Sequence, residues 1–141
     1  MATTVKGMKA PQWVIDAQYI DLVTYRKSGV AVSSPVWFAI DDQDRLVVYA
    51  DGSSGKVKRI RNSGTVSIAV CSMKGKHLGP LMPATAVLLP DSQGPVVHGF
   101  LDKKYGWKKR LFTLGGTLVE KLKRKPANPE GFIAITLDQQ A

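Results

Sequence analysis

The chain has 141 residues, enough for one domain with an ordinary core, because a chain of this length buries roughly two thirds of its unfolded surface on folding. Its single cysteine excludes an internal disulfide and an all-cysteine metal site, and the N-terminus lacks an apolar stretch for targeting or anchoring, so we expect a soluble, cytoplasmic protein. The formal net charge of +9 indicates a polyanionic partner: nucleic acid, an anionic membrane surface, or a small molecule with phosphate or carboxylate groups.

The first half of the chain is predicted to form a short helix and then three antiparallel strands. Alternating apolar residues mark the strands, and the turns between them fall at Gly29, which suits the positive φ of a hairpin, and at the acidic run 41–44. We read the acidic run as a turn, because the glycine and distal glutamate of a calcium loop are missing. The expected helix covers residues 11–18, and the expected strands cover residues 19–25, 30–40 and 45–50.

The strand expected over residues 30–40 has two different faces. One face carries valine, phenylalanine and isoleucine, which suit a core. On the other face small residues surround one large ring, which leaves space for a flat ligand. This second face consists of Ala31, Ser33, Pro35, Trp37 and Ala39.

The rest of the chain is predicted to add a helix, three strands and a helical pair. The strand expected over residues 65–71 also has an apolar face and a small-residue face, and Ser67, Ala69 and Cys71 lie on the small-residue face. The next strand contains Pro80 and Pro83, which suit an edge or a bulge. The expected helices cover residues 53–62, 96–105 and 107–122, and the expected strands cover residues 65–71, 78–89 and 131–137.

These elements favour a mainly β (α+β) fold in a single domain, 1–141. Several short antiparallel strands, about six in all, with one small helix between them and helices near the end, are typical of a compact barrel with attached helices. Residues 1–10 are expected to form a flexible N-terminus.

The helix expected over residues 53–62 carries the strongest functional signal, because it holds four cations and no acid. A helix N-terminus presents unpaired N–H groups and about half a positive charge, so Lys56 in the first turn is repelled unless an anion binds. Three-residue spacing puts Arg59 on the same face as Lys56, which predicts a phosphate site. The alternative is a solvated cationic face, since Lys58 and Arg61 form a second such pair.

The residues before this helix fit the same interpretation. Ser53 and Ser54 can each cap the helix or donate to a phosphate oxygen, and we assign Ser54 to phosphate and Ser53 to structure. Gly55 allows close approach of the backbone to an anion.

The order of these features resembles the split β-barrel superfamily of pyridoxamine 5′-phosphate oxidase-like proteins, and within it the flavin and deazaflavin oxidoreductase branch. The resemblance covers most of the chain and is carried by residues 22–25 with Gly29, 34–39, 54–62 and 103–112. It implies a homodimer that holds its cofactor in a groove between subunits, with the phosphate on the cationic helix and the ring along the proline-containing strand.

In this branch the implied cofactor is the deazaflavin coenzyme F420, whose phosphodiester and oligoglutamate tail account for the positive charge of the chain, and FMN is the alternative. The implied activity is hydride transfer from the reduced coenzyme to an electrophilic double bond of a small conjugated substrate. No side chain is assigned a catalytic role, and no metal is expected. The expected cofactor-binding residues are Ser34, Pro35, Val36, Trp37, Ala50, Asp51, Ser54, Gly55, Lys56, Arg59, Cys71, Gly79 and Pro80.

Two stretches depart from true pyridoxamine phosphate oxidases. Those enzymes carry an arginine where residues 33–36 read Ser-Ser-Pro-Val here, and an Arg-Gln pair where residues 79–82 read Gly-Pro-Leu-Met. Oxidation of pyridoxamine phosphate is therefore not expected.

Other functions stay open at this point. The family also contains proteins that hold a flavin or haem without turnover. The cationic tract 103–125 interleaves aromatic residues with lysines and therefore also fits nucleic acid. We favour a different interpretation, in which its aromatic residues pack against the barrel and its lysines lie in water or contact the acidic tail of the coenzyme. Cys71 is expected to pack near the ligand rather than to react, because no histidine or cation adjoins it in its strand.

Overall fold

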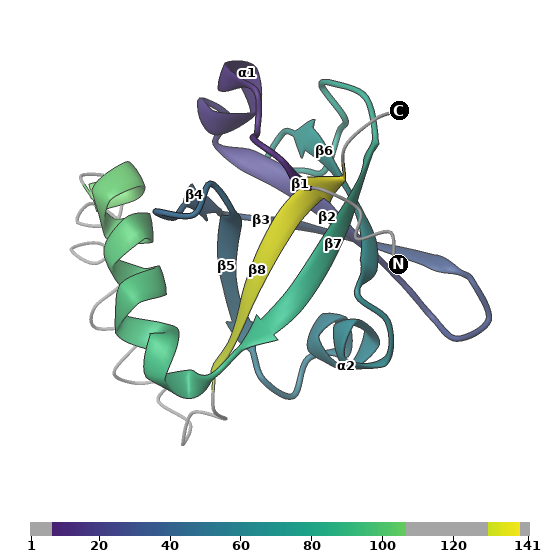
Figure 1. Ribbon diagram of the computed structural model, residues 1–141. Coiled ribbons are helices and arrows are strands. Elements are labelled where there is room, and N and C mark those ends of the chain that lie inside the picture. The colour runs from purple at the N-terminus through teal and green to yellow at the C-terminus, as the bar shows by residue number, and fades with distance from the viewer. Residues whose placement is uncertain (1–6, 107–129, 139–141) are drawn as a thin grey trace, which may run out of the picture.

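The computed structural model describes residues 7–106 and 130–138, and their strands form one antiparallel sheet (Figure 1). The sheet order is β3-β2-β6-β7-β8-β5-β4, and β1 pairs with β8. The strands are β1 (Gly7–Met8), β2 (Tyr19–Tyr25), β3 (Ala31–Val36), β4 (Ala39–Ile40), β5 (Leu46–Asp51), β6 (Thr65–Cys71), β7 (Met82–Leu89) and β8 (Glu130–Asp138). The helices are α1 (Gln12–Ile15), α2 (Gly55–Asn62), the 3-10 turn η1 (Asp91–Gln93) and a helix over residues 94–106, which we call the outer helix.

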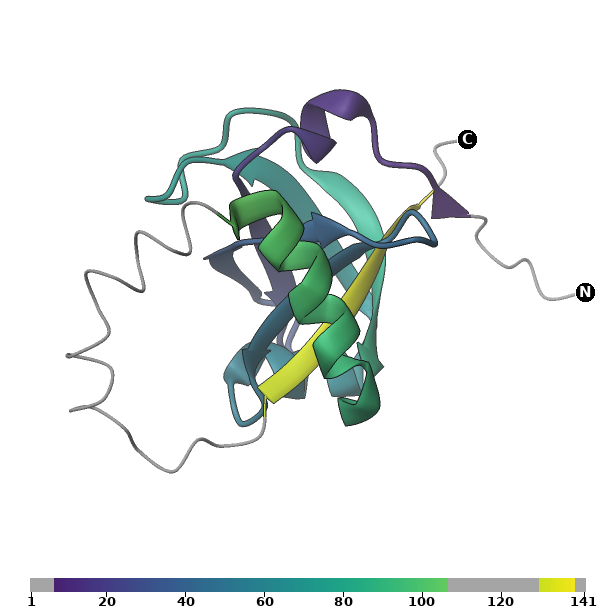
Figure 2. The same ribbon diagram turned by 90° about the vertical axis from the view of Figure 1, so that its left-hand side faces the viewer.

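The sheet curls into a half-barrel, which confirms the predicted split β-barrel. Figure 1 places α1 at one end of the barrel and α2 at the other, and Figure 2 shows the outer helix lying across the outside of the sheet. The six longer strands match the expected number, and β1 and β4 add two residues each.

The main core lies inside the curled sheet. Alternate residues of β8, namely Ile133, Ile135 and Leu137, point inward and are at most 2% exposed. Val57 and Ile60 of α2, three residues apart on one helix face, join this core and close the end of the barrel. Burying each such side chain contributes about 1.5–3 kcal/mol, so this contact fixes the position of α2.

A second apolar cluster lies on the outer face of the sheet. Val97, Leu101 and Tyr105 of the outer helix, spaced four residues apart, pack against Val47 of β5 and Phe132 of β8. The helix predicted over residues 96–105 is therefore confirmed, while the helix predicted over residues 107–122 lies outside the described residues.

The strand predicted over residues 30–40 is divided in two. β3 lies at one edge of the sheet and β4 lies at the other edge, so the segment 31–40 runs from one edge to the other, with Trp37 and Phe38 between the two strands. The single-strand prediction is wrong at this point, because closing the half-barrel requires the segment to leave β2 and join β5.

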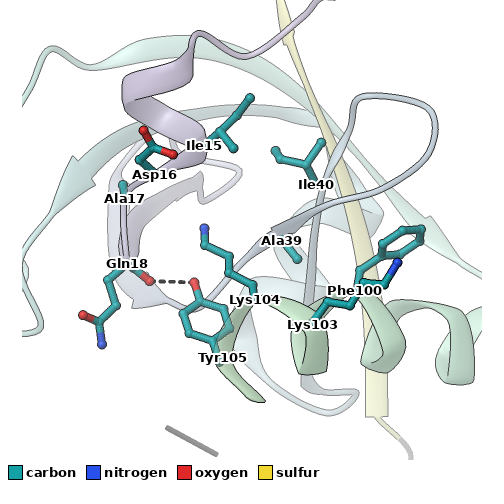
Figure 3. Close-up of a pocket in the computed structure, with 10 residues that line it drawn as sticks. All are labelled: Ile15, Asp16, Ala17, Gln18, Ala39, Ile40, Phe100, Lys103, Lys104 and Tyr105. Atoms are coloured by element: carbon teal, nitrogen blue, oxygen red, sulfur yellow. Dashed lines mark hydrogen bonds between the residues drawn. The ribbon is translucent and has the colours of Figure 1, made fainter. Parts of the chain in front are cut away.

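The buried hydroxyl of Tyr105 holds this crossing. It accepts a hydrogen bond from Phe38 N at 3.3 Å and can donate to the carbonyl oxygen of Phe38 at 2.9 Å. It can also donate to the carbonyl oxygen of Gln18 at 2.7 Å, the bond drawn in Figure 3. Burial raises the pKa of Tyr105 to about 12, against the effect of its hydrogen bond to Phe38, so the hydroxyl keeps its proton as a donor.

Most other predicted boundaries agree with the structure. The strands predicted over residues 19–25 and 65–71 match β2 and β6 to the residue, and Gly29 has a φ of 90°. The acidic run is a turn in which the Asp41 carboxylate accepts from Gln43 N and from Arg45 N and Nε. A flexible segment was expected over residues 1–10, whereas Gly7 and Met8 pair with β8.

The predicted strand 78–89 differs in two ways. β7 begins only at Met82, and it lies between β6 and β8, so of the two placements that the prolines suggested, an edge or a bulge, the edge is wrong. Pro83 is tolerated in a central strand because it is the second residue of β7, and pairing with β8 starts one residue later, at Ala84.

Among the helices of the described residues, none has the length and the apolar composition needed to cross a membrane.

Replacing Tyr105 by Phe is expected to lower the free energy of unfolding by about 1–3 kcal/mol, because Phe38 N and the Gln18 carbonyl lose a buried hydrogen-bond partner. Urea denaturation followed by circular dichroism measures this change. Tyr25→Phe is the matched control, since within the described residues its hydroxyl forms a hydrogen bond with Ser67, in a half-buried position, and its loss should cost at most about 1 kcal/mol. Equal losses in the two variants would contradict the role assigned to Tyr105.

Candidate anion-binding and cofactor site

The turn before α2 is built by side chains. Ser54 is the N-cap residue, and its Oγ accepts a hydrogen bond from Val57 N at 3.5 Å. Asp51 accepts from the N–H and the hydroxyl of Ser53, at 2.8 and 2.7 Å, through the same carboxylate oxygen. Asp51 and Ser53 therefore shape the turn, while Ser54 still has its own proton for an anion because a serine hydroxyl both accepts and donates.

Arg59 reaches back from the second turn of α2 to its first turn. Its Nε donates to Oγ1 of Thr24, a buried residue of β2, at 2.6 Å. Its guanidinium also lies over Gly55, since a Cβ at that position would stand 2.6 Å from Nη1. The missing side chain of Gly55 thus makes room for a second positive charge beside the N-terminus of the helix.

Lys56 lies beside this guanidinium and is half-buried. Burial lowers the pKa of Lys56, and the positive charge of Arg59 lowers it further. The ion pairs within the described residues join Lys9 to Asp44, Arg45 to Asp41 and His77 to Asp21, and none of them involves Lys56 or Arg59.

The second cationic pair of α2 differs in its surroundings. Lys58 and Arg61 are exposed, whereas Lys56 and Arg59 are half-buried against the barrel. The alternative of a solvated cationic face therefore applies to Lys58 and Arg61 and not to Lys56 and Arg59. Two half-buried cations at a helix N-terminus form a strongly positive site, and an oxyanion bound there would offset their repulsion.

The predicted ring-binding strand lies at the edge of the sheet. Ser34 N donates to the Asp21 carboxylate at 2.9 Å, and Pro35 has no N–H, so neither backbone nitrogen can donate freely to a ligand. Val36 is buried in the main core. The indole of Trp37 stacks on Tyr105, with ring centroids 4.5 Å apart and planes 8° from parallel, so protein covers one face of that ring.

The two small-residue faces inferred from the sequence lie on the same side of the sheet, with β2 between them. β2 lies between β3 and β6, and Asp21 pairs with Pro35 on one side and with Ala69 on the other. On β3 this face is exposed at Ala31, Ser33 and Pro35. The prediction that both strands contribute to one face is confirmed.

A contact between the buried Asp21 and His77 on this face was not predicted from the sequence. Asp21 is 1% exposed, and its second carboxylate oxygen lies 2.7 Å from Nε2 of His77. The sequence does carry a signal for this contact, because Asp21 is an acidic residue within the apolar run of β2, and a buried carboxylate needs hydrogen-bond partners. Cys71 is buried nearby, and burial, with the negative charge of Asp21, raises the pKa of its thiol, which agrees with a packing role.

The structure does not bring all the predicted residues together. Ala50 and Asp51 end β5, and the turn of residues 52–54 joins them to α2, on the side of the cationic pair. Gly79 instead lies against Trp13 of α1, with the position of a Cβ 3.2 Å from the indole, and Pro80 lines a small cavity of about 250 Å³ with Met8 of β1. Since α1 and α2 lie at opposite ends of the barrel in Figure 1, Gly79 and Pro80 are separated from the anion site.

No protein-family model and no curated protein matches the chain. Solved structures do. An F420 reductase is 17% identical, with 94% of this chain and 96% of that one covered and a TM-score of 0.58. A FAD-binding protein from Mesorhizobium loti is 16% identical, with 91% and 84% covered and a TM-score of 0.58. A putative pyridoxamine 5′-phosphate oxidase from Listeria innocua is 14% identical, with 91% of each chain covered and a TM-score of 0.54.

Proteins of other or unknown function share the fold. The haem storage protein HutZ from Vibrio cholerae is 14% identical, with 95% of this chain and 92% of that one covered and a TM-score of 0.56. A protein of unknown function from Agrobacterium tumefaciens is 10% identical, and 98% of this chain spans only 62% of its length, with a TM-score of 0.57. At such identities the likeness shows the split β-barrel fold of pyridoxamine 5′-phosphate oxidase-like proteins.

Replacing Lys56 by Gln is expected to raise the free energy of unfolding by about 0.3–1 kcal/mol in buffer without phosphate or sulfate, because a cation leaves the positive end of a helix dipole. The direction agrees with the lowered pKa of Lys56: the folded protein holds this proton less readily than the unfolded chain, so the charge opposes folding at neutral pH.

Urea denaturation of the wild type and the variant measures the change. Lys58→Gln is the control, since this lysine is exposed, water screens its charge, and its loss should alter stability by less than about 0.3 kcal/mol. A destabilised Lys56→Gln protein would show instead that Lys56 supports the fold.

Proposed function

We propose that this protein binds coenzyme F420 and that, with the reduced coenzyme, it transfers hydride to an electrophilic double bond of a small conjugated molecule. The observation that carries the proposal is the pair of half-buried cations, Lys56 and Arg59, which meet at the N-terminus of α2 without a carboxylate partner among the described residues. Such a site suits the phosphodiester of the coenzyme.

The residues fit a phosphate group in detail. The Nε of Arg59 is bound to Thr24, which leaves the two Nη groups of a fixed guanidinium for phosphate oxygens. Lys56 supplies a second charge, Ser54 a hydroxyl proton, and the first turn of α2 its unpaired N–H groups. Binding at this site orients the rest of the coenzyme relative to β3.

The ring of the coenzyme is proposed to lie along the small-residue face of β3. Bound there, the reduced deazaflavin supplies the hydride, and the protein binds and orients the two reactants and excludes water. The exposure of Ala31, Ser33 and Pro35 supports the further proposal that a second copy of the chain covers this face and completes the groove.

The positive charge of the chain favours F420 over FMN. Both cofactors carry a phosphate that the cationic pair can bind, so the pair alone does not separate them. The oligoglutamate tail of F420 adds several carboxylates, which the formal net charge of +9 would attract. An FMN-dependent oxidase or reductase of the same fold is the second candidate.

Anaerobic fluorescence titration of the purified protein with F420, FMN and haem tests the choice of cofactor. We expect F420 to bind at least tenfold more tightly than FMN, and a deazaflavin riboside without phosphate or glutamates to bind more weakly than both. Addition of an enone to the reduced F420 complex should then reoxidise the coenzyme. Haem binding in preference to F420, or binding without any turnover, would contradict the proposal.

Lys56→Gln and Arg59→Gln are each expected to weaken F420 binding by roughly 10–100-fold, the cost of losing one hydrogen bond to a charged group. Lys58→Gln should weaken F420 binding by no more than about threefold, because this lysine is exposed and attracts the coenzyme only through long-range electrostatics. Equal losses in all three variants would show that F420 senses net charge and not a built site.

A further inference from the structure

A larger cavity, of about 590 Å³, lies at the other end of the barrel (Figure 3). Its walls come from the end of α1 and the residues after it, from β4 and from the outer helix, and they include apolar side chains of Ile15, Ile40 and Phe100. Since α2 closes the opposite end, this cavity is separate from the anion site described above (Figure 1).

A buried amine is the distinctive feature of this cavity. Nζ of Lys104 has almost no accessible surface and no hydrogen-bond partner within the described residues. It lies 3.4 Å from the centroid of the Phe38 ring, so a cation–π contact covers one side of it, and Figure 3 shows its side chain extending from the outer helix into the cavity.

An ammonium group without an acceptor is costly to bury, because each of its three donors has given up water. Burial lowers the pKa of Lys104 to about 8, and the negative charge of Asp16 opposes this shift, so most of the amine is still charged at neutral pH. Asp16 forms no ion pair with it in the structure and instead accepts a hydrogen bond from Gln12 at 2.9 Å.

The charges around the cavity favour an anion. Lys103 and Lys104 both line it, against the single carboxylate of Asp16. The flexible four-carbon stem of Lys104 allows its amine to turn further into the cavity. The remaining wall is mostly apolar, so the matching ligand carries one negative group at one end of an apolar body.

We propose that this cavity binds a small carboxylate with an aromatic or aliphatic body. The Lys104 amine donates to the carboxylate, and the body packs against Ile15, Ile40 and Phe100. The assignment does not depend on F420 binding at α2.

Isothermal titration calorimetry with benzoate and octanoate, and with the uncharged benzyl alcohol, tests the proposal at neutral pH. We expect at least one carboxylate to bind at a single site and at least tenfold more tightly than the alcohol. If neither carboxylate binds saturably, or if benzyl alcohol binds equally well, the proposal is wrong. This comparison needs no variant and therefore does not depend on how a mutation affects folding.

Variants then assign the binding to Lys104. Lys104→Met keeps the length and apolar character of the stem, so it should fold and should weaken carboxylate binding at least tenfold. Lys103→Met, at the exposed rim, should weaken it about threefold or less, and Lys56→Gln at α2 should leave it unchanged. Asp16→Asn removes the competing acid and should strengthen binding. Unchanged affinity in Lys104→Met, or a loss in Asp16→Asn, would overturn the proposal.

Discussion

The position of α2 is the constraint on which the candidate function depends. Val57 and Ile60 are buried in the end of the barrel, and this burial fixes the helix against β2. The residues beside them, Lys56 and Arg59, then lie at the border of the barrel and cannot be fully solvated. The apolar face of the helix thus stabilises an arrangement that is electrostatically unfavourable by itself. Proteins commonly keep such arrangements at functional sites, where a ligand offsets the unfavourable charge.

Much of the fold could be predicted because it follows from short-range patterns. β2 and β6 are mostly apolar runs next to turn-forming residues, which are residues 26–29 after β2 and 63–64 before β6, so their ends are visible in the sequence. The division of the segment 31–40 could not be predicted, because apolar residues continue through Trp37 and Phe38 and the break comes from closure of the sheet. Strand order is likewise a tertiary property, and for this reason the prolines near β7 suggested an edge that does not exist.

The candidate site was likewise predictable where it depends on local spacing and not where it depends on long-range contacts. Lys56 and Arg59 are three residues apart on one helix, so their spacing is enough to place them together. Thr24, the hydrogen-bond partner of Arg59, is 35 residues from it in the chain, and His77 is 56 residues from Asp21, so neither contact has a local signal. The buried amine of Lys104 was equally hidden, because in the sequence it is one of many lysines in a basic tract.

Phosphate binding at the first turn of α2 is the central claim, and an NMR titration of the ¹⁵N-labelled protein with inorganic phosphate tests it most directly. The account predicts that the largest amide shifts fall on Gly55, Lys56 and Val57, with a change at the Nε of Arg59, and that they saturate together. If these resonances stay fixed, or if the largest shifts fall on amides at the α1 end of the barrel, the site described for α2 is not an anion site.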